Sequence, residues 1–143
     1  MAVFLDSNIV LYALGDDEAK CAVATGLLAA WPTISTQVIN ECSHVLRRKL
    51  RISPTQTAEE LENVIDLVQL VDVGVHEIRA AWMLATRYGF SHYDSLIIAA
   101  ALSAGCATLY TEDMQHGQVI DERLTLINPF LSGAEAPAIQ QPL

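Results

Sequence analysis

The stretch AVFLDSN, residues 2–8, runs from four apolar residues directly into a carboxylate. An apolar run this short, followed by polar turn formers, predicts a buried β-strand that ends at Asp6. Open parallel sheets bind their ligands beyond the carboxyl ends of the strands, so Asp6 is a candidate functional residue. The segment Asp6-Ser7-Asn8 is also typical of a helix cap, which is the alternative interpretation.

The rest of the chain alternates short apolar runs with segments of helical periodicity. Capping signals at Thr36 and Ser53 mark helix starts, and Gly89 is in the usual position just after a helix. This alternation predicts an α/β fold with a mainly parallel sheet of four or five strands, covered by helices on both faces. The predicted strands cover residues 2–6, 33–35, 70–73, 107–110 and 124–127, and the predicted helices cover 9–14, 16–30, 37–50, 53–70, 75–88 and 91–105.

The chain has 143 residues, of which 52% are hydrophobic, enough to bury the core of one domain. Residues 1–131 are predicted to form this domain, and residues 132–143 a flexible tail without periodicity. No apolar stretch reaches membrane-spanning length, and the early acid argues against a signal peptide. The three cysteines are widely spaced and predict reduced thiols in a cytoplasmic protein; they are Cys21, Cys42 and Cys106.

The formal net charge of −9 disfavours a nucleic acid as partner, because polyanions repel acidic proteins. The basic residues are concentrated, however, and four of the eight form one tract at the end of a predicted helix: Arg47, Arg48, Lys49 and Arg51. This tract is a candidate RNA-binding surface. A solvated helix terminus favoured by the helix dipole explains it equally well.

Three further carboxylates border apolar runs. Glu41 and Asp94 share the apolar faces of predicted helices, and Asp113 follows the predicted strand 107–110. Buried unpaired anions are unfavourable, so four converging acids require a cation, and Mg²⁺ or Mn²⁺ prefers oxygen ligands. If the sheet brings them together, the pattern indicates metal-assisted phosphodiester hydrolysis. Taken singly, each acid has a structural explanation as a cap, a helix-boundary residue or a turn residue.

These acids stand in motifs that resemble one family. The motifs are FLDSN (4–8), INE (39–41), HYDSLIIAAA (92–101) and LYTEDM (109–114). Together they resemble the PIN domain, and within that family the small VapC-type toxins of bacterial toxin–antitoxin pairs. The similarity extends from Val3 to Phe130 and leaves only the tail outside.

The resemblance implies a three-layer α/β/α fold and a Mg²⁺- or Mn²⁺-dependent endoribonuclease of the cytoplasm. It assigns Asp6, Glu41, Asp94 and Asp113 as catalytic metal ligands, and it places Asn8 and Thr111 beside them to orient the carboxylates. The implied partners are an RNA substrate, a cognate antitoxin and a second copy of the chain. Operator DNA would be bound only through the antitoxin complex, and no membrane is involved.

Two other functions fit parts of the pattern. A haloacid-dehalogenase-like phosphatase also has an Asp after its first strand, but it requires a second acid two residues later, where this chain has Asn8. A non-catalytic acidic module would use the four carboxylates to dock basic side chains of a partner. The four histidines lack metal-ligand spacing and are assigned structural or surface roles.

Overall fold

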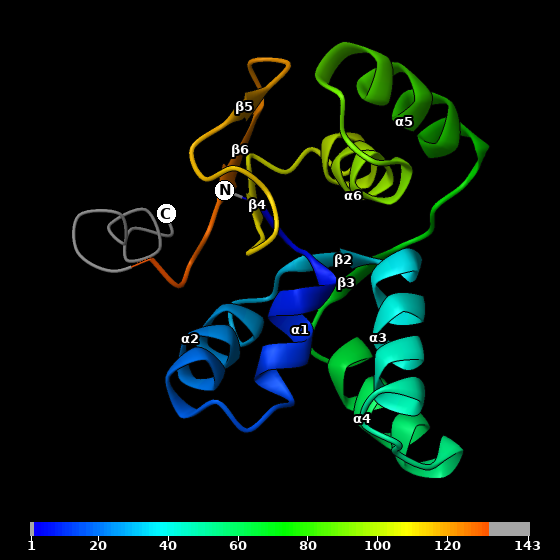
Figure 1. Cartoon of the computed structure of the whole chain (residues 1–143), viewed down its shortest axis with the longest axis vertical. Coiled ribbons are helices and arrows are strands. Elements are labelled where there is room, and N and C mark those ends of the chain that lie inside the picture. The colour runs from blue at the N-terminus through cyan, green and yellow to red at the C-terminus, as the bar shows by residue number, and fades with distance from the viewer. Residues whose placement is uncertain (1, 132–143) are drawn as a thin grey trace.

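A computed structural model describes residues 2–131, and a six-stranded sheet runs through the centre of the molecule (Figure 1). The strand order is β3-β2-β1-β4-β6-β5, and every neighbouring pair is parallel except β5 and β6. The predicted α/β fold with a mainly parallel sheet is confirmed. The sheet has six strands rather than the four or five expected; β5, which matches none of the five predicted ranges, is too short to give a periodic signal. The strands are β1 Val3–Leu5, β2 Thr33–Ser35, β3 Gln69–Val71, β4 Thr108–Tyr110, β5 Val119–Ile120 and β6 Leu124–Ile127.

Helices cover both faces of this sheet, giving three layers (Figure 1). Helices α1 to α4 pack together on one side, and α5 packs along α6 on the other. Right-handed crossovers explain this division, because the chain moves outward from β1 to β3 and then returns past β1 to β4. The helices are α1 Ser7–Ala13, α2 Glu18–Leu28, α3 Thr36–Arg48, α4 Pro54–Ile65, α5 Val75–Tyr88 and α6 His92–Ser103. The tail predicted over residues 132–143 lies outside the described residues.

Strand β1 is the point at which the direction of the strand order reverses. It pairs with β2 on one side and with β4 on the other, and Leu5 is in register with Tyr110. In α/β sheets, the crevice for ligands lies beyond the carboxyl ends of the strands at such a reversal. The residues that follow β1 and β4 are therefore in position to form a site.

Side-chain caps set where most of the helices begin. Ser53 and Ser91 cap α4 and α6 by accepting hydrogen bonds from the backbone N–H groups three residues later. Thr36 does not cap α3 as predicted, because Ser35 accepts the N–H of Val38 instead (3.3 Å). The Thr36 hydroxyl accepts the N–H of Val73 (3.2 Å), which ties the start of α3 to the segment after β3.

Helix α6 is the most deeply buried helix, because it lies between α5 and the sheet. Its residues 95–101 are all buried, so the helix start, and with it Asp94, is held firmly at the edge of the sheet. All three cysteines are free thiols, as predicted. Within residues 2–131, no helix has the length and apolar character needed to span a membrane.

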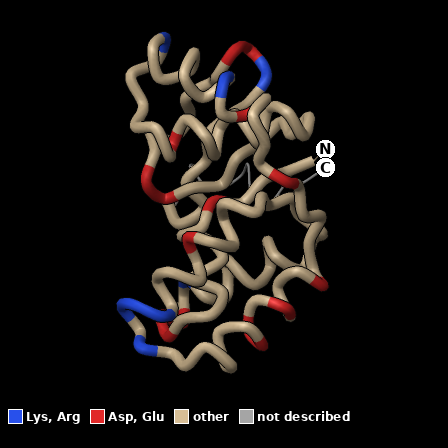
Figure 2. The backbone as a smooth tube through the Cα atoms, turned by 90° about the vertical axis from the view of Figure 1, so that its right-hand side faces the viewer, with Lys and Arg blue, Asp and Glu red and all other residues tan. Residues whose placement is uncertain are grey.

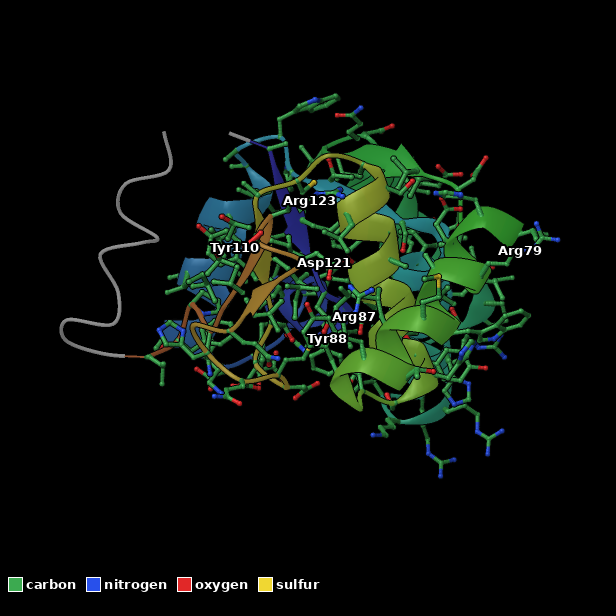
Figure 3. The ribbon with its side chains drawn as sticks, turned by 90° about the horizontal axis from the view of Figure 1, so that it is seen from above. Arg79, Arg87, Tyr88, Tyr110, Asp121 and Arg123 are labelled. Atoms are coloured by element: carbon green, nitrogen blue, oxygen red, sulfur yellow. The ribbon has the colours of Figure 1, made fainter. Side chains whose placement is uncertain are left out.

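A polar cluster joins the end of α5 to the turn between β5 and β6. Figure 3 shows Arg87 and Tyr88 directed toward Asp121. Arg87 Nη1 and the Tyr88 hydroxyl both donate to Asp121 Oδ1, at 2.6 and 2.8 Å. The N–H of Asp121 donates back to the Tyr88 oxygen (2.9 Å). This cluster pairs the Asp121 carboxylate with a cation and holds the antiparallel edge of the sheet against α5.

Candidate active site

A cleft of about 760 Å³ opens at the carboxyl edge of the sheet. The structure brings together there all four acids that the sequence indicated: Asp6, Glu41, Asp94 and Asp113. Its described lining contains no lysine or arginine. The other residues that line the cleft are Ser7, Gln37, Asn40, His44, Val45, Tyr93 and Ile97.

Asp6 is the most buried of these acids, with 4% of its surface exposed. It is the N-cap of α1 and accepts the N–H of Ser7 (2.7 Å). Asp6 is therefore both a helix cap and a cleft residue, so the two interpretations of the sequence are compatible. Its second oxygen accepts the hydroxyl of Thr111 (2.8 Å). Burial raises the pKa of Asp6 to about 6; the two hydrogen bonds oppose the rise, and the charges of Glu41 and Asp94 add to it. Loss of solvation is therefore only partly offset.

Asn8 and Thr111 join the segment after β1 to the segment after β4. Asn8 Nδ2 donates to Asp113 Oδ2 (3.0 Å), and Asn8 Oδ1 accepts the N–H of Glu112 (3.2 Å). Thr111 accepts the N–H of Asp113 (3.2 Å) while it donates to Asp6. The two residues thus lie beside the acids, where the resemblance placed them, and hold Asp6 and Asp113 in fixed orientations.

Glu41 and Asp94 come from helices on opposite faces of the sheet. Glu41 Oε2 accepts a hydrogen bond from Gln37 Nε2, one turn earlier on α3 (2.8 Å). The same nitrogen donates to the backbone carbonyl of Tyr93 (3.3 Å) and thereby links α3 to the start of α6. Burial raises the pKa of Asp94; a hydrogen bond from Ser91 opposes the rise, and the charges of Asp113 and Glu41 add to it. The four carboxylates therefore influence one another electrostatically.

The donor set suits a hard divalent cation, because four carboxylates supply oxygen ligands and the described lining has no lysine or arginine to compete for them. Neither of the two ion pairs within residues 2–131 involves any of the four acids. In the described residues, no group of three or more His, Cys, Asp or Glu side chains has the geometry to hold one ion. Asp113 and Glu41 are instead turned to Asn8 and Gln37. The chemistry fits a cation, and closing around it requires side-chain rotation.

Behind the cleft lies a compensated group that sequence reasoning missed, the Glu112 cluster of Tyr12, Lys20 and Glu112. Lys20 forms an ion pair with Glu112, and the Tyr12 hydroxyl donates to the same carboxylate (2.5 Å). The Tyr12 ring meets Phe130 edge to face (5.0 Å), and the Lys20 ammonium lies over both rings. Residues so far apart in the sequence give no local signal of their contact.

The basic tract is placed outside the cleft, at the far end of α3, where Figure 2 shows it as a blue segment. Arg47 lines a separate groove between α3 and α4. Arg48 shares a helix face with Glu41 and His44, because residues three, four and seven apart lie on the same side of a helix. Sequence reasoning also missed the neutral cleft residues Gln37, Asn40 and Tyr93; their polar or aromatic character beside Glu41 and Asp94 was the available signal.

Comparison with known proteins gives one family and a set of related folds. A family model described as PIN domain matches residues 3–120. No curated protein has a significant sequence match to the chain. Among solved structures, the Mycobacterium tuberculosis toxin VapC20, which cleaves the sarcin–ricin loop, is 18% identical with a TM-score of 0.64, over 78% of this chain and 90% of that one.

Two solved assemblies are also similar in fold. A toxin–antitoxin complex from Klebsiella pneumoniae contains a chain 17% identical to this one, with a TM-score of 0.67, over 91% of this chain and 98% of that one. VapBC2 from Rickettsia felis, bound to a DNA fragment from its promoter, contains a chain 21% identical with a TM-score of 0.66, over 88% and 97% of the two chains. At these identities the similarity concerns the fold.

Proposed function

The chain belongs to the PIN domain family, and from this premise we propose that it is a Mg²⁺- or Mn²⁺-dependent endoribonuclease, the toxin of a toxin–antitoxin pair. One observation carries the proposal. Four carboxylates from four separate segments of the chain meet in one cleft, and no described lysine or arginine lines that cleft. Such an arrangement is costly for folding alone and is useful for holding a cation against a phosphodiester.

In this proposal Asp6, Glu41, Asp94 and Asp113 would hold the ion. The chemistry that a divalent ion supplies is a lowered pKa of attacking water and stabilisation of negative charge on the phosphoryl oxygens. Thr111 and Ser7 keep Asp6 in one orientation, since each donates to a different carboxylate oxygen. The amide side chains at positions 8 and 37 hold Asp113 and Glu41 in the same cleft as the buried Asp6.

The proposed partners follow from the same family. The complexes from Klebsiella pneumoniae and Rickettsia felis support a cognate antitoxin, and the promoter-bound one supports contact with operator DNA through the antitoxin. A homodimer is proposed on the resemblance to VapC-type toxins. We expect induced expression of the chain to arrest bacterial growth, and co-expression of the antitoxin to restore it.

The decisive experiment is cleavage of total cellular RNA by purified, partner-free protein, with cut ends mapped by sequencing. We expect cleavage at defined internal sites with Mg²⁺ or Mn²⁺ and none with excess chelator. Asp94→Asn should lower the rate by on the order of 10³-fold or more, because the electrostatic stabilisation it supports amounts to several kcal/mol.

Asp66→Asn is the matched control, because Asp66 is exposed at the end of α4, outside the cleft. It should cleave at the wild-type rate. Cleavage that resists chelator, or an Asp94→Asn protein as active as Asp66→Asn, contradicts the proposal. Release of phosphate from small esters without RNA cleavage favours the phosphatase alternative.

A further inference from the structure

Tyr93 is a large aromatic residue exposed at the proposed active site. It precedes Asp94 in the first turn of α6, lines the cleft, and has 64% of its surface exposed. Its backbone carbonyl is held by Gln37 (3.3 Å), and its ring meets His92 edge to face, with centroids 5.2 Å apart. The residue is thus held through its backbone and its neighbour's ring, while its own ring remains uncovered next to the half-buried Asp94.

Beside Glu41, the neighbouring wall of the cleft also presents an amide and an imidazole side chain. Asn40 and His44 lie one turn apart on α3, and both are exposed. Amide and imidazole groups both donate and accept hydrogen bonds, as the edges of nucleobases do. A cleft of about 760 Å³ has room for a nucleotide, which a site for a phosphate group alone does not need.

Because the cleft is negatively charged, RNA must be bound there partly through its bases. The cleft has four carboxylates and no described lysine or arginine on its lining, so the phosphate backbone gains no attraction there from basic side chains. The first lysine or arginine on the same helix face is Arg48, two turns beyond Glu41 along α3. Binding next to the scissile bond must therefore come from the ion and from uncharged contacts.

We propose that Tyr93 is a base-stacking platform and that the enzyme takes RNA with an unpaired base beside the scissile phosphate. The ring offers one π-face to that base, and Asn40 and His44 face its edge. Single-stranded RNA is recognised in this way on aromatic side chains, whereas a paired base is already stacked in its helix. The inference rests on the proposed function and specifies its substrate.

The test compares Tyr93→Leu, Tyr93→Phe and the wild type on one mapped RNA. Tyr93→Leu keeps apolar bulk without a π-face and should raise KM by roughly 5- to 100-fold, with a smaller change in kcat. Tyr93→Phe should stay within about twofold of the wild type, because it keeps the ring. Trp31→Leu is the control, since Trp31 is 63% exposed and precedes β2, at the opposite edge of the sheet.

A second measurement separates stacking from a structural effect. RNAs lacking the base at one nucleotide beside the cleaved bond are compared with the intact RNA. One such abasic RNA should raise the wild-type KM as much as Tyr93→Leu does on intact RNA, and Tyr93→Leu should lose nothing further on it. Sequestering the same nucleotides in a duplex should abolish wild-type cleavage.

The outcomes separate this inference from the proposed function. If the wild type cleaves no RNA with either metal ion, the nuclease proposal itself fails. If the wild type cleaves but Tyr93→Leu has an unchanged KM, the stacking role is wrong while the nuclease stands. The stacking role is also wrong if Tyr93→Leu and each abasic RNA raise KM additively. It is likewise wrong if the wild type cleaves the duplex as well as the unpaired RNA.

Discussion

Glu112 and Asp113 are neighbours in the chain, yet they belong to two carboxylate groups in opposite electrostatic situations. Burial raises the pKa of Glu112, but hydrogen bonds from Lys20 and Tyr12 outweigh it and leave the pKa below its ordinary value. Asp113, by contrast, lies in the cleft with the other three acids. The most buried of these, Asp6, has a pKa raised to about 6 by burial and by nearby negative charge.

The difference shows what each group does for the molecule. The Glu112 cluster contains its own cation, so its charge is compensated when the chain folds. The cleft acids have no such partner among the described residues, so their repulsion weakens the fold until a cation from outside joins them. A carboxylate therefore stabilises the fold in the Glu112 cluster, whereas the carboxylates of the cleft are available to bind a cation.

The largest effect that tests this contrast is stabilisation by a divalent ion. Mn²⁺ or Mg²⁺ at 100 times its dissociation constant should raise the free energy of unfolding by about 3 kcal/mol, because only the folded chain gathers the acids. Denaturant unfolding with and without the ion measures it. Asp94→Asn should lose most of the gain, and Asp66→Asn should keep it. Equal stabilisation of both variants places the ion elsewhere.

Removing the charge of Asp6 should stabilise the metal-free protein. The pKa of Asp6 is about 6 in the folded chain against an ordinary 3.8, so the folded state holds the proton more tightly. Below about pH 4, Asp6 is protonated in both the folded and the unfolded chain and does not change the free energy of unfolding. As the pH rises toward 6, the unfolded chain loses this proton more readily, so the free energy of unfolding falls, and the loss is complete above pH 6. Asp6→Asn should therefore unfold with about 2 kcal/mol more free energy at pH 7.5, after allowance for the weakened bond to Thr111.

The pH dependence is the check on this prediction. The advantage of Asp6→Asn over the wild type should shrink steadily from pH 6.5 to pH 4 in chelator, as measured by urea unfolding at each pH. A constant difference across that range means that the carboxylate is already compensated in the folded protein. The same variant should cleave no RNA, so stability and activity should change in opposite directions.

The sequence predicted the parts of the molecule that depend on local pattern. Asp6 and Asp113 follow apolar runs, and Glu41 and Asp94 lie at helical spacing from apolar residues, so their placement at one sheet edge followed from the α/β alternation. Their roles as metal ligands remain predictions. The edge strand β5 was missed because two residues carry no periodicity.

What could not be predicted depends on contacts between distant segments. Lys20 meets Glu112 across 92 positions, and nothing in the residues around either one specifies the other. The hydroxyl of Thr36 was assigned to a cap because the spacing allowed it, whereas Ser35 had the extended backbone conformation a cap needs. When two neighbouring residues could both cap a helix, the backbone conformation of the folded chain decides which of them does so.

The smallest test acts on the compensated side of the comparison. Tyr12→Phe removes the hydroxyl that donates to Glu112 but keeps the ring against Phe130. It should lower the free energy of unfolding by about 1 kcal/mol, the net value of a partly exposed hydrogen bond. RNA cleavage should stay within about threefold of the wild type, because Asn8 still holds the N–H of Glu112 and the Asp113 carboxylate. A large loss of cleavage with unchanged stability would show that the Glu112 cluster positions the cleft acids, and the two carboxylate groups would then act as one unit.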